Sequence, residues 1–244
     1  MKVGSLGFAG SGKTTYLGAL TLSLLQGDTT SDLALFSFES VETARDLTLY
    51  ADRIQKGGWP ARTDSSKVVE YAVRLRRGEV VFSLRIPELP GELLEEVWRT
   101  DHIPAPLSFL ATYDAYLLLV DPLLEDPERA AAHHVHLLQG LKRARGWKRS
   151  EMASEPLALV LTKWDALDPA DQAQGPEAWL RESFPLLDDF LATNFTRRAA
   201  FAVSAVGALD AAGTPLLQEE RVRPQGIFRP LEWVADQLQP AARG

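Results

Sequence analysis

Four short, mainly apolar segments predict strands of one sheet. The runs at residues 116–120 and 157–161 are apolar throughout, which is typical of strands buried on both faces of a parallel sheet. A short run at residues 3–7 ends in glycine, and a run at residues 199–203 predicts a last buried strand.

Segments with other patterns of apolar and polar residues lie between these runs. Residues 68–76 and 80–86 alternate apolar and polar positions, and the Arg77-Gly78-Glu79 turn between them predicts a hairpin. Helical spacing predicts helices at residues 14–26, 39–55 and 126–145, a broken helical region at 176–192, and a last helix that Pro230 opens. The first helix is expected to bury one face, formed by Leu17, Leu20, Leu24 and Leu25.

Strands that alternate with helices predict an α/β fold with three layers and a mostly parallel, doubly wound sheet. The 244 residues suit a single domain over 1–244, and 45% hydrophobic residues allow a packed core. Gly57-Gly58-Trp59-Pro60 breaks regular structure, within an expected switch or insert region at about 27–67. Residues 207–228 are expected to be a long loop, and the C-terminal loop and helix span 207–244.

Composition limits the classes of function. The chain has no cysteine, which excludes disulfides, thiolate zinc sites and cysteine nucleophiles. Its formal net charge of −7 argues against a large nucleic-acid interface, because binding to a phosphate backbone requires a basic face. Its longest apolar runs are too short to span a membrane. We therefore expect a cytoplasmic protein.

Residues 7–14, GFAGSGKT, match the phosphate-loop pattern GxxxxGK[ST] in full. The glycines let the backbone wrap closely around phosphate oxygens, and the N–H groups at the start of the next helix attract anions. Lys13 supplies a positive charge for the β- and γ-phosphates, and the Thr14 hydroxyl completes a Mg²⁺ shell. The predicted phosphate-binding residues are Gly7, Ala9, Gly10, Ser11, Gly12, Lys13, Thr14 and Thr15.

A second motif, Thr162-Lys163-Trp164-Asp165, directly follows an apolar run and selects the base. The Asp165 carboxylate can accept hydrogen bonds from guanine N1–H and the exocyclic amine, and adenine offers no such pair of donors. The Lys163 stem can lie along the base plane, and a backbone N–H after the last strand can meet guanine O6. The predicted base-binding residues are Thr162, Lys163, Asp165, Ser204, Ala205 and Val206.

In this order, the motifs resemble those of the Ras-like GTPases of the translation-factor (TRAFAC) class. GFAGSGKT is similar to their first motif, TKWD to their NKxD motif and SAV to their SAK motif. The resemblance covers nearly the whole chain and implies a P-loop NTPase with Ras-like GTPase topology. The GKTTYL, GGWPART, PGE and RPQGIFRPLEW segments resemble the bacterial double-GTPase families in particular.

The resemblance implies GTP and GDP as ligands and Mg²⁺ as the metal. The metal-side residues would be Thr14, Glu88 and Thr63. Glu88 replaces the aspartate of the DxxG motif and keeps a carboxylate that can reach Mg²⁺. Thr63 is the expected switch-I threonine, with Thr29 and Thr30 as alternatives.

The resemblance also implies GTP hydrolysis, with Lys13, Thr63, Gly91 and Glu92 as the catalytic residues. Gly91 would supply the N–H that senses the γ-phosphate. Glu92 stands where Ras-like proteins have the glutamine that orients water. A carboxylate there can accept a proton but repels the γ-phosphate, so hydrolysis is expected to be slow without a partner's arginine.

Three functions remain open. The first is a GTP-hydrolysing switch whose partner is a protein effector or activator, which includes another GTPase in a homo- or heterodimer. The second is a pseudo-GTPase scaffold, and the third is a P-loop ATPase or kinase, against which Asp165 and Ser204 argue. No nucleic-acid partner is expected, and membrane contact is expected only peripherally through a partner.

Other features point to structure rather than chemistry. His133, His134 and His136 lie together on a predicted helix and are interpreted as a solvated face, with a metal site as the alternative. Five basic residues in 142–149 are interpreted as a helix end favoured by the helix dipole. Trp59 and Trp98 are either partner-facing anchors or core residues.

Overall fold

The computed structural model describes residues 1–28, 30–60, 69–88, 96–97, 99–100, 102–148, 150–210, 213–217 and 221–239. Its strands are β1 (Lys2–Leu6), β2 (Leu33–Phe38), β3 (Val69–Arg77), β4 (Val80–Glu88), β5 (Ala115–Val120), β6 (Leu157–Leu161) and β7 (Arg198–Ala202). Its helices are α1 (Lys13–Leu25), α2 (Val41–Gln55), α4 (Pro127–Ala144), α5 (Pro169–Gln174), α6 (Pro176–Ser183), α7 (Pro185–Asn194) and α8 (Arg229–Leu238), with 3₁₀ helices η1 (Ala105–Thr112) and η2 (Trp164–Ala166). None of the helices in these ranges is both long and apolar enough to cross a membrane.

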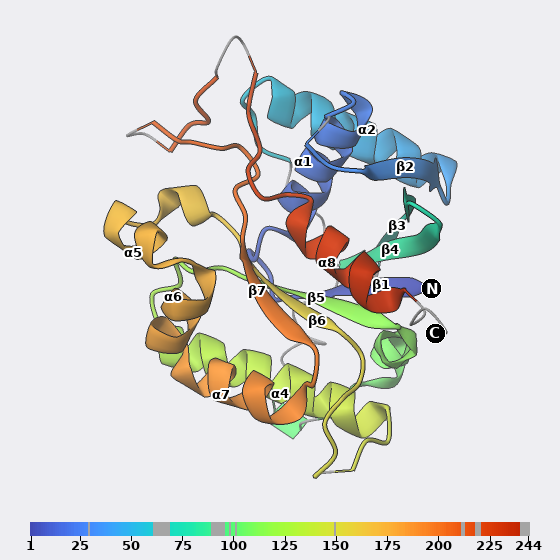
Figure 1. Ribbon diagram of the computed structural model, residues 1–244, viewed down its shortest axis with the longest axis vertical. Helices are drawn as coiled ribbons and strands as arrows, with labels where there is room; N and C mark the ends of the chain where they lie inside the picture. Colours follow the sequence, from blue (N-terminus) through green and yellow to red (C-terminus); the bar gives the residue numbers. More distant parts are fainter. Residues whose placement is uncertain are drawn as a thin grey trace.

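One seven-stranded sheet runs through the molecule in the order β2-β3-β4-β1-β5-β6-β7 (Figure 1). Strands β4, β1, β5, β6 and β7 are parallel, and β3 and β2 extend the sheet by antiparallel pairing. Helices α1, α2 and α8 cover one face, and α4, α6 and α7 cover the other (Figure 1). This arrangement confirms the predicted three-layer, mostly parallel, doubly wound sheet.

The centre of the sheet is buried on both faces, as predicted. Every residue of β5 is 0% exposed. Leu117 and Leu119 pack in the core under α1 and α8, while Tyr116 and Leu118 pack in the core under α4. Strand β7 was expected to be buried, but its residues are only half-buried because it is the edge strand of the sheet.

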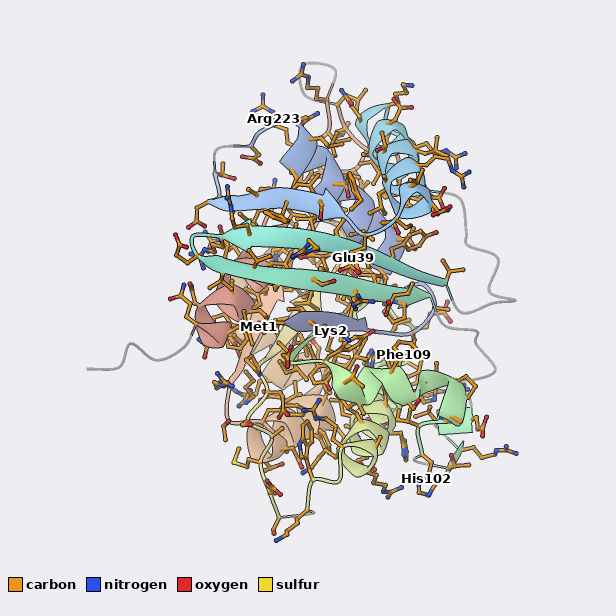
Figure 2. The ribbon with its side chains drawn as sticks, turned by 90° about the vertical axis from the view of Figure 1, so that its right-hand side faces the viewer. Met1, Lys2, Glu39, His102, Phe109 and Arg223 are labelled. Carbon is orange, nitrogen blue, oxygen red and sulfur yellow. The ribbon has the colours of Figure 1, made fainter. Side chains whose placement is uncertain are left out.

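The opposite edge strand, β2, has no counterpart among the predicted elements. A bulge in its middle shifts the register against β3, which removes the regular alternation that marks a strand in sequence. Helix α2 begins at Val41, two residues later than predicted, because Ser40 caps it by accepting a hydrogen bond from Thr43 N (3.0 Å). Glu39 lies at the junction and receives a hydrogen bond from Arg85 of β4 (2.6 Å; Figure 2).

Helix α1 is buried nearly all round, and not along one face as expected. Leu17 and Leu20 are fully buried as predicted, but Leu25 is 52% exposed. Helix α2 packs against the side that would otherwise face solvent, and Gly18 leaves room there for the Ile54 side chain. Helix α2, which lies between β1 and β3 in the chain, therefore packs beside α1 on the same face of the sheet.

The basic residues at the end of α4 hold the fold together. Lys142 is 7% exposed, and its Nζ donates to the carbonyl oxygen of Glu151 (2.9 Å) and to Asn194 Oδ1 (2.6 Å). Arg145 donates to two backbone carbonyl oxygens at the end of η1, at 2.7 Å each. These bonds tie α4 to η1 and α7, so two of the five positive charges are occupied within the fold.

Candidate functional site

The phosphate loop joins β1 to α1 at the carboxyl edge of the parallel strands, which is where ligands bind in such sheets. Gly10 and Gly12 have φ of +83° and +81°, in the left-handed region that favours glycine. A Cβ at Gly7 would lie 2.7 Å from the carbonyl oxygen of Leu119, so the loop passes too close to β5 for a side chain. Gly12 is the N-cap of α1, and the first amides of that helix have no partner within the helix.

Lys13 folds back over this loop. Its Nζ donates to the carbonyl oxygens of Gly7 (2.7 Å) and Phe8 (2.9 Å). The ammonium group thus stands beside the loop and next to the positive end of the α1 dipole, and both favour an anion. Thr14 follows in the first turn of α1, as the phosphate-loop pattern predicts.

Histidine side chains of α4 pack against the phosphate loop. The Phe8 ring packs edge-on against the ring of His134 (4.9 Å between centroids) and against His133 (5.6 Å). His134 is 2% exposed, and burial lowers its pKa to about 4, so the ring is neutral at pH 7. The prediction of a solvated histidine face is therefore wrong for His134, because α4 turns it toward the phosphate loop. Among the described residues, no three or more His, Asp or Glu side chains are grouped so that they could hold a metal ion.

Thr162 links the phosphate loop to the predicted base-binding motif. Its Oγ1 donates to the carbonyl oxygens of Ser11 (3.1 Å) and Val120 (3.2 Å). A Cβ at Gly12 would lie 3.5 Å from the Thr162 side chain, which places the two loops in contact. The hydroxyl of Thr162 therefore bridges back to the phosphate loop.

Lys163 has a left-handed backbone conformation and a buried partner. Its φ of +52° is the only positive φ among the described non-glycine residues. Such a conformation costs about 1–2 kcal/mol and is kept where surrounding contacts impose it. Its Nζ forms a short ion pair with the carboxylate of Asp121, directly after β5. Asp121 was not among the predicted site residues, although a carboxylate directly after a wholly apolar strand is a signal for it.

Asp165 and Ser204 lie on the loops after β6 and β7. Asp165 is half-buried within η2, whose Trp164 packs edge-on against Trp179 of α6 (6.0 Å between centroids). Ser204 is 3% exposed, and its Oγ accepts a hydrogen bond from Gly207 N (2.8 Å). Trp164 N donates to the carbonyl oxygen of Val203 (3.2 Å), which joins the two loops. The structure thus brings together the predicted base-binding residues.

The chain after β7 is fastened to this loop, although residues 207–228 were expected to be only a loop. Ser204 and Gln225 exchange two backbone hydrogen bonds (3.0 and 2.8 Å). A Cβ at Gly207 would lie 2.1 Å from the carbonyl oxygen of Arg223, and a Cβ at Gly226 would lie 2.3 Å from that of Ala202. Figure 2 labels Arg223 on this returning segment. Two close backbone crossings therefore fix the base-side loop.

The predicted site residues Thr63, Gly91 and Glu92 lie outside the described residues. Thr29, the alternative switch-I threonine, and Trp98 also lie outside them. Glu88 is the last residue of β4, and the parallel register of β4 with β1 places it at the same edge of the sheet as the phosphate loop. Trp59 is 47% exposed and is therefore not a core residue.

Comparisons with known proteins agree with this geometry. A family model described as Double-GTPase 1 matches residues 5–131 and 122–222. A search of the curated proteins finds no match. Among solved structures, the chain is similar in fold to the S. cerevisiae Ski7 GTPase-like domain bound to GTP, with a TM-score of 0.52 and 13% sequence identity. That match covers 100% of this chain but 51% of the Ski7 chain, so the chain spans about half of it.

Proposed function

This chain belongs to the Double-GTPase 1 family and is a GTP-binding P-loop protein of the translation-factor class, and we propose that it hydrolyses GTP to GDP with Mg²⁺ and serves as a nucleotide-dependent switch. The observation that carries this proposal is the direct link between its two loops. Thr162 hydrogen-bonds to Ser11 of the phosphate loop. In the chain, Thr162 directly precedes Lys163 and lies three residues before Asp165. One ligand with a triphosphate and a base can therefore contact both loops.

The phosphate loop would hold the charged end of this ligand. On binding, Lys13 would exchange its two loop carbonyls for the β- and γ-phosphates, and the Thr14 hydroxyl would face the metal. Glu88, at the end of β4, would contact Mg²⁺ through water, and Thr63 would complete the shell from switch I. When bound by these residues, Mg²⁺ would supply positive charge that offsets the negative charge of the phosphates.

Hydrolysis would be slow in the isolated protein. Gly91 would sense the γ-phosphate, and Glu92 would lie beside the attacking water in place of the glutamine of Ras-like proteins. A partner that supplies an arginine would accelerate the reaction by about 10³- to 10⁵-fold. The implied partner is a protein effector or activator, which includes another GTPase.

Nucleotide binding and turnover test the proposal together. Calorimetric titration with GTP, GDP and ATP in Mg²⁺ should show binding of both guanine nucleotides and much weaker binding of ATP. Phosphate release should be slow but measurable. Tighter binding of ATP than of GTP would contradict the guanine assignment.

The Asp165→Asn variant sharpens this test. It should weaken GTP and GDP binding roughly 100-fold and favour xanthine nucleotides, whose edge complements the amide. Asp168→Asn is the matched control, because Asp168 lies three residues later and caps α5 by accepting from Ala170 N (2.9 Å), which asparagine can also do. Equal effects of the two variants would argue that Asp165 only supports the local structure.

A pseudo-GTPase scaffold is the alternative function. Glutamate stands at positions 88 and 92, where the family pattern has aspartate and glutamine, and this favours a protein that binds GTP without efficient turnover. Tight GTP binding with no phosphate release, alone and with candidate GTPase partners, would support the scaffold over the switch.

A further inference from the structure

We propose that Asp121 is a positioning residue that holds Lys163 ready for the guanine nucleotide. This inference rests on the proposed function and adds to it a residue that lies in none of the nucleotide-binding motifs. Asp121 directly follows β5, in the loop that leads to α4. It lies beside β6, whose carboxyl end carries Thr162 and Lys163.

The two carboxylate oxygens of Asp121 have different tasks. Oδ1 accepts a hydrogen bond from Leu123 N (3.0 Å), which orients the side chain within its own loop. Oδ2 pairs with Lys163 Nζ at close range. Because one oxygen is fixed by the backbone, the other is presented to the lysine in a defined direction. The carboxylate is therefore oriented before any nucleotide arrives.

Burial makes this pair asymmetric. The Asp121 side chain is 11% exposed, whereas the Lys163 side chain is 42% exposed. A cation beside it offsets part of the free-energy cost of removing this carboxylate from water. Because the Lys163 side chain stays partly exposed while its Nζ is paired, a base can still pack along it.

The rest of Lys163 is already fixed, so the side chain is the remaining freedom that Asp121 can remove. Thr162, the preceding residue, bonds to Val120 through both its backbone N (3.0 Å) and its Oγ1 (3.2 Å). After Lys163, Trp164 N bonds to the Val203 carbonyl (3.2 Å). A flexible lysine that must be ordered on binding reduces affinity, and a lysine that is ordered beforehand does not.

The consequence is specific to the base end of the nucleotide. Asp121 and Lys163 lie on the β5 and β6 loops, which carry none of the residues proposed to sense the γ-phosphate or the metal. Loss of Asp121 should therefore weaken GTP and GDP equally. The loss of Asp121 should act through faster nucleotide dissociation, because a Lys163 side chain that Asp121 no longer holds does not stay packed along the base.

Asp121→Asn tests this, because asparagine can keep its oxygen on Leu123 N but turns an uncharged NH₂ group, which donates and cannot accept, toward Lys163. Dissociation of fluorescent GDP and of a fluorescent non-hydrolysable GTP analogue is followed by stopped-flow mixing with excess unlabelled nucleotide. Both dissociation rates should rise roughly fivefold in Asp121→Asn. A change of this size corresponds to the free-energy cost of ordering one long side chain. Lys163→Met should raise them at least as much. The double variant should be no faster than Lys163→Met alone.

Asp126→Asn is the matched control. Asp126 lies in the same loop and accepts from Arg129 N (2.9 Å) at the start of α4. It should leave both dissociation rates within experimental error of the parent protein. Asp121→Glu should recover part of the loss, and thermal unfolding of each variant shows whether its fold is intact.

Two results would overturn the inference. One is unchanged release from Asp121→Asn, and the other is a double variant whose effect is the product of the single effects. If the parent protein bound no guanine nucleotide at all, the proposed function itself would fail, and this outcome is distinct from both.

Discussion

The phosphate end and the base end of the site are built in opposite ways. The phosphate end is one continuous segment, residues 7–14, and it relies on glycine conformations, helix amides and one lysine. The base end is assembled from loops after β5, β6 and β7, together with the returning segment at Gln225 and Gly226. A contiguous site can be recognised from local sequence, whereas an assembled site depends on the topology that brings distant loops together.

Removal of the Lys13 side chain should have the largest effect on nucleotide affinity. It tests how far the phosphate end depends on one charge. Lys13→Ala should weaken both GTP and GDP by roughly 1,000-fold, or about 4 kcal/mol, because two charge-assisted contacts to phosphate are lost. Isothermal titration calorimetry measures this directly. The control is Lys148→Ala, an exposed lysine after α4. Binding within tenfold of the parent would show that the backbone amides alone hold the phosphates.

The contrast between the two ends explains what the sequence could predict. The phosphate loop, the TKWD motif and the serine after β7 each lie just after a strand, as predicted, because each is a short pattern at the end of a predicted strand. The parallel centre of the sheet followed from the wholly apolar runs of β5 and β6. These features depend on residues that are neighbours in the chain.

The features that were missed depend on distant residues. Asp121 has a role only because β5 and β6 are neighbours in the sheet, which places it beside Lys163. The tight placement of Gly226 against Ala202 follows from the path of the returning chain, which has no local signal. Likewise, His134 was interpreted as solvated because its contact with Phe8 joins α4 to the phosphate loop. These two residues are far apart in the chain, so no local pattern shows the contact.

A glycine at the base end should have the next largest effect. Gly226 has a φ of +67°, and an added Cβ would lie 2.3 Å from the Ala202 carbonyl oxygen. Gly226→Ala should lower the free energy of unfolding by roughly 2–3 kcal/mol, from backbone strain together with the clash. It should also weaken guanine binding, because the segment that pairs with Ser204 must shift. Chemical denaturation and calorimetry measure the two effects.

Gly213→Ala separates strain from collision. Gly213 has a similar φ of +77°, but an added Cβ would meet nothing within 4 Å. Its variant should therefore show only the backbone strain, about 1 kcal/mol, with unchanged nucleotide affinity. If the two variants behaved alike, the close crossing at Gly226 would not be what fixes the base-side loop.

The smallest of these effects should come from the bond that joins the two ends. Thr162→Val keeps the shape of the side chain and removes the hydroxyl that donates to Ser11 and Val120. We expect a loss of about 1 kcal/mol in affinity, equal for GTP and GDP, because a net hydrogen bond contributes about that much and both nucleotides span the two loops. Thr193→Val is the control, since Thr193 donates to the Asp189 carbonyl oxygen (2.9 Å) on distant α7. A loss confined to GTP would mean that the link acts through the γ-phosphate, whereas an unchanged affinity for both would mean that the two ends are held in place independently.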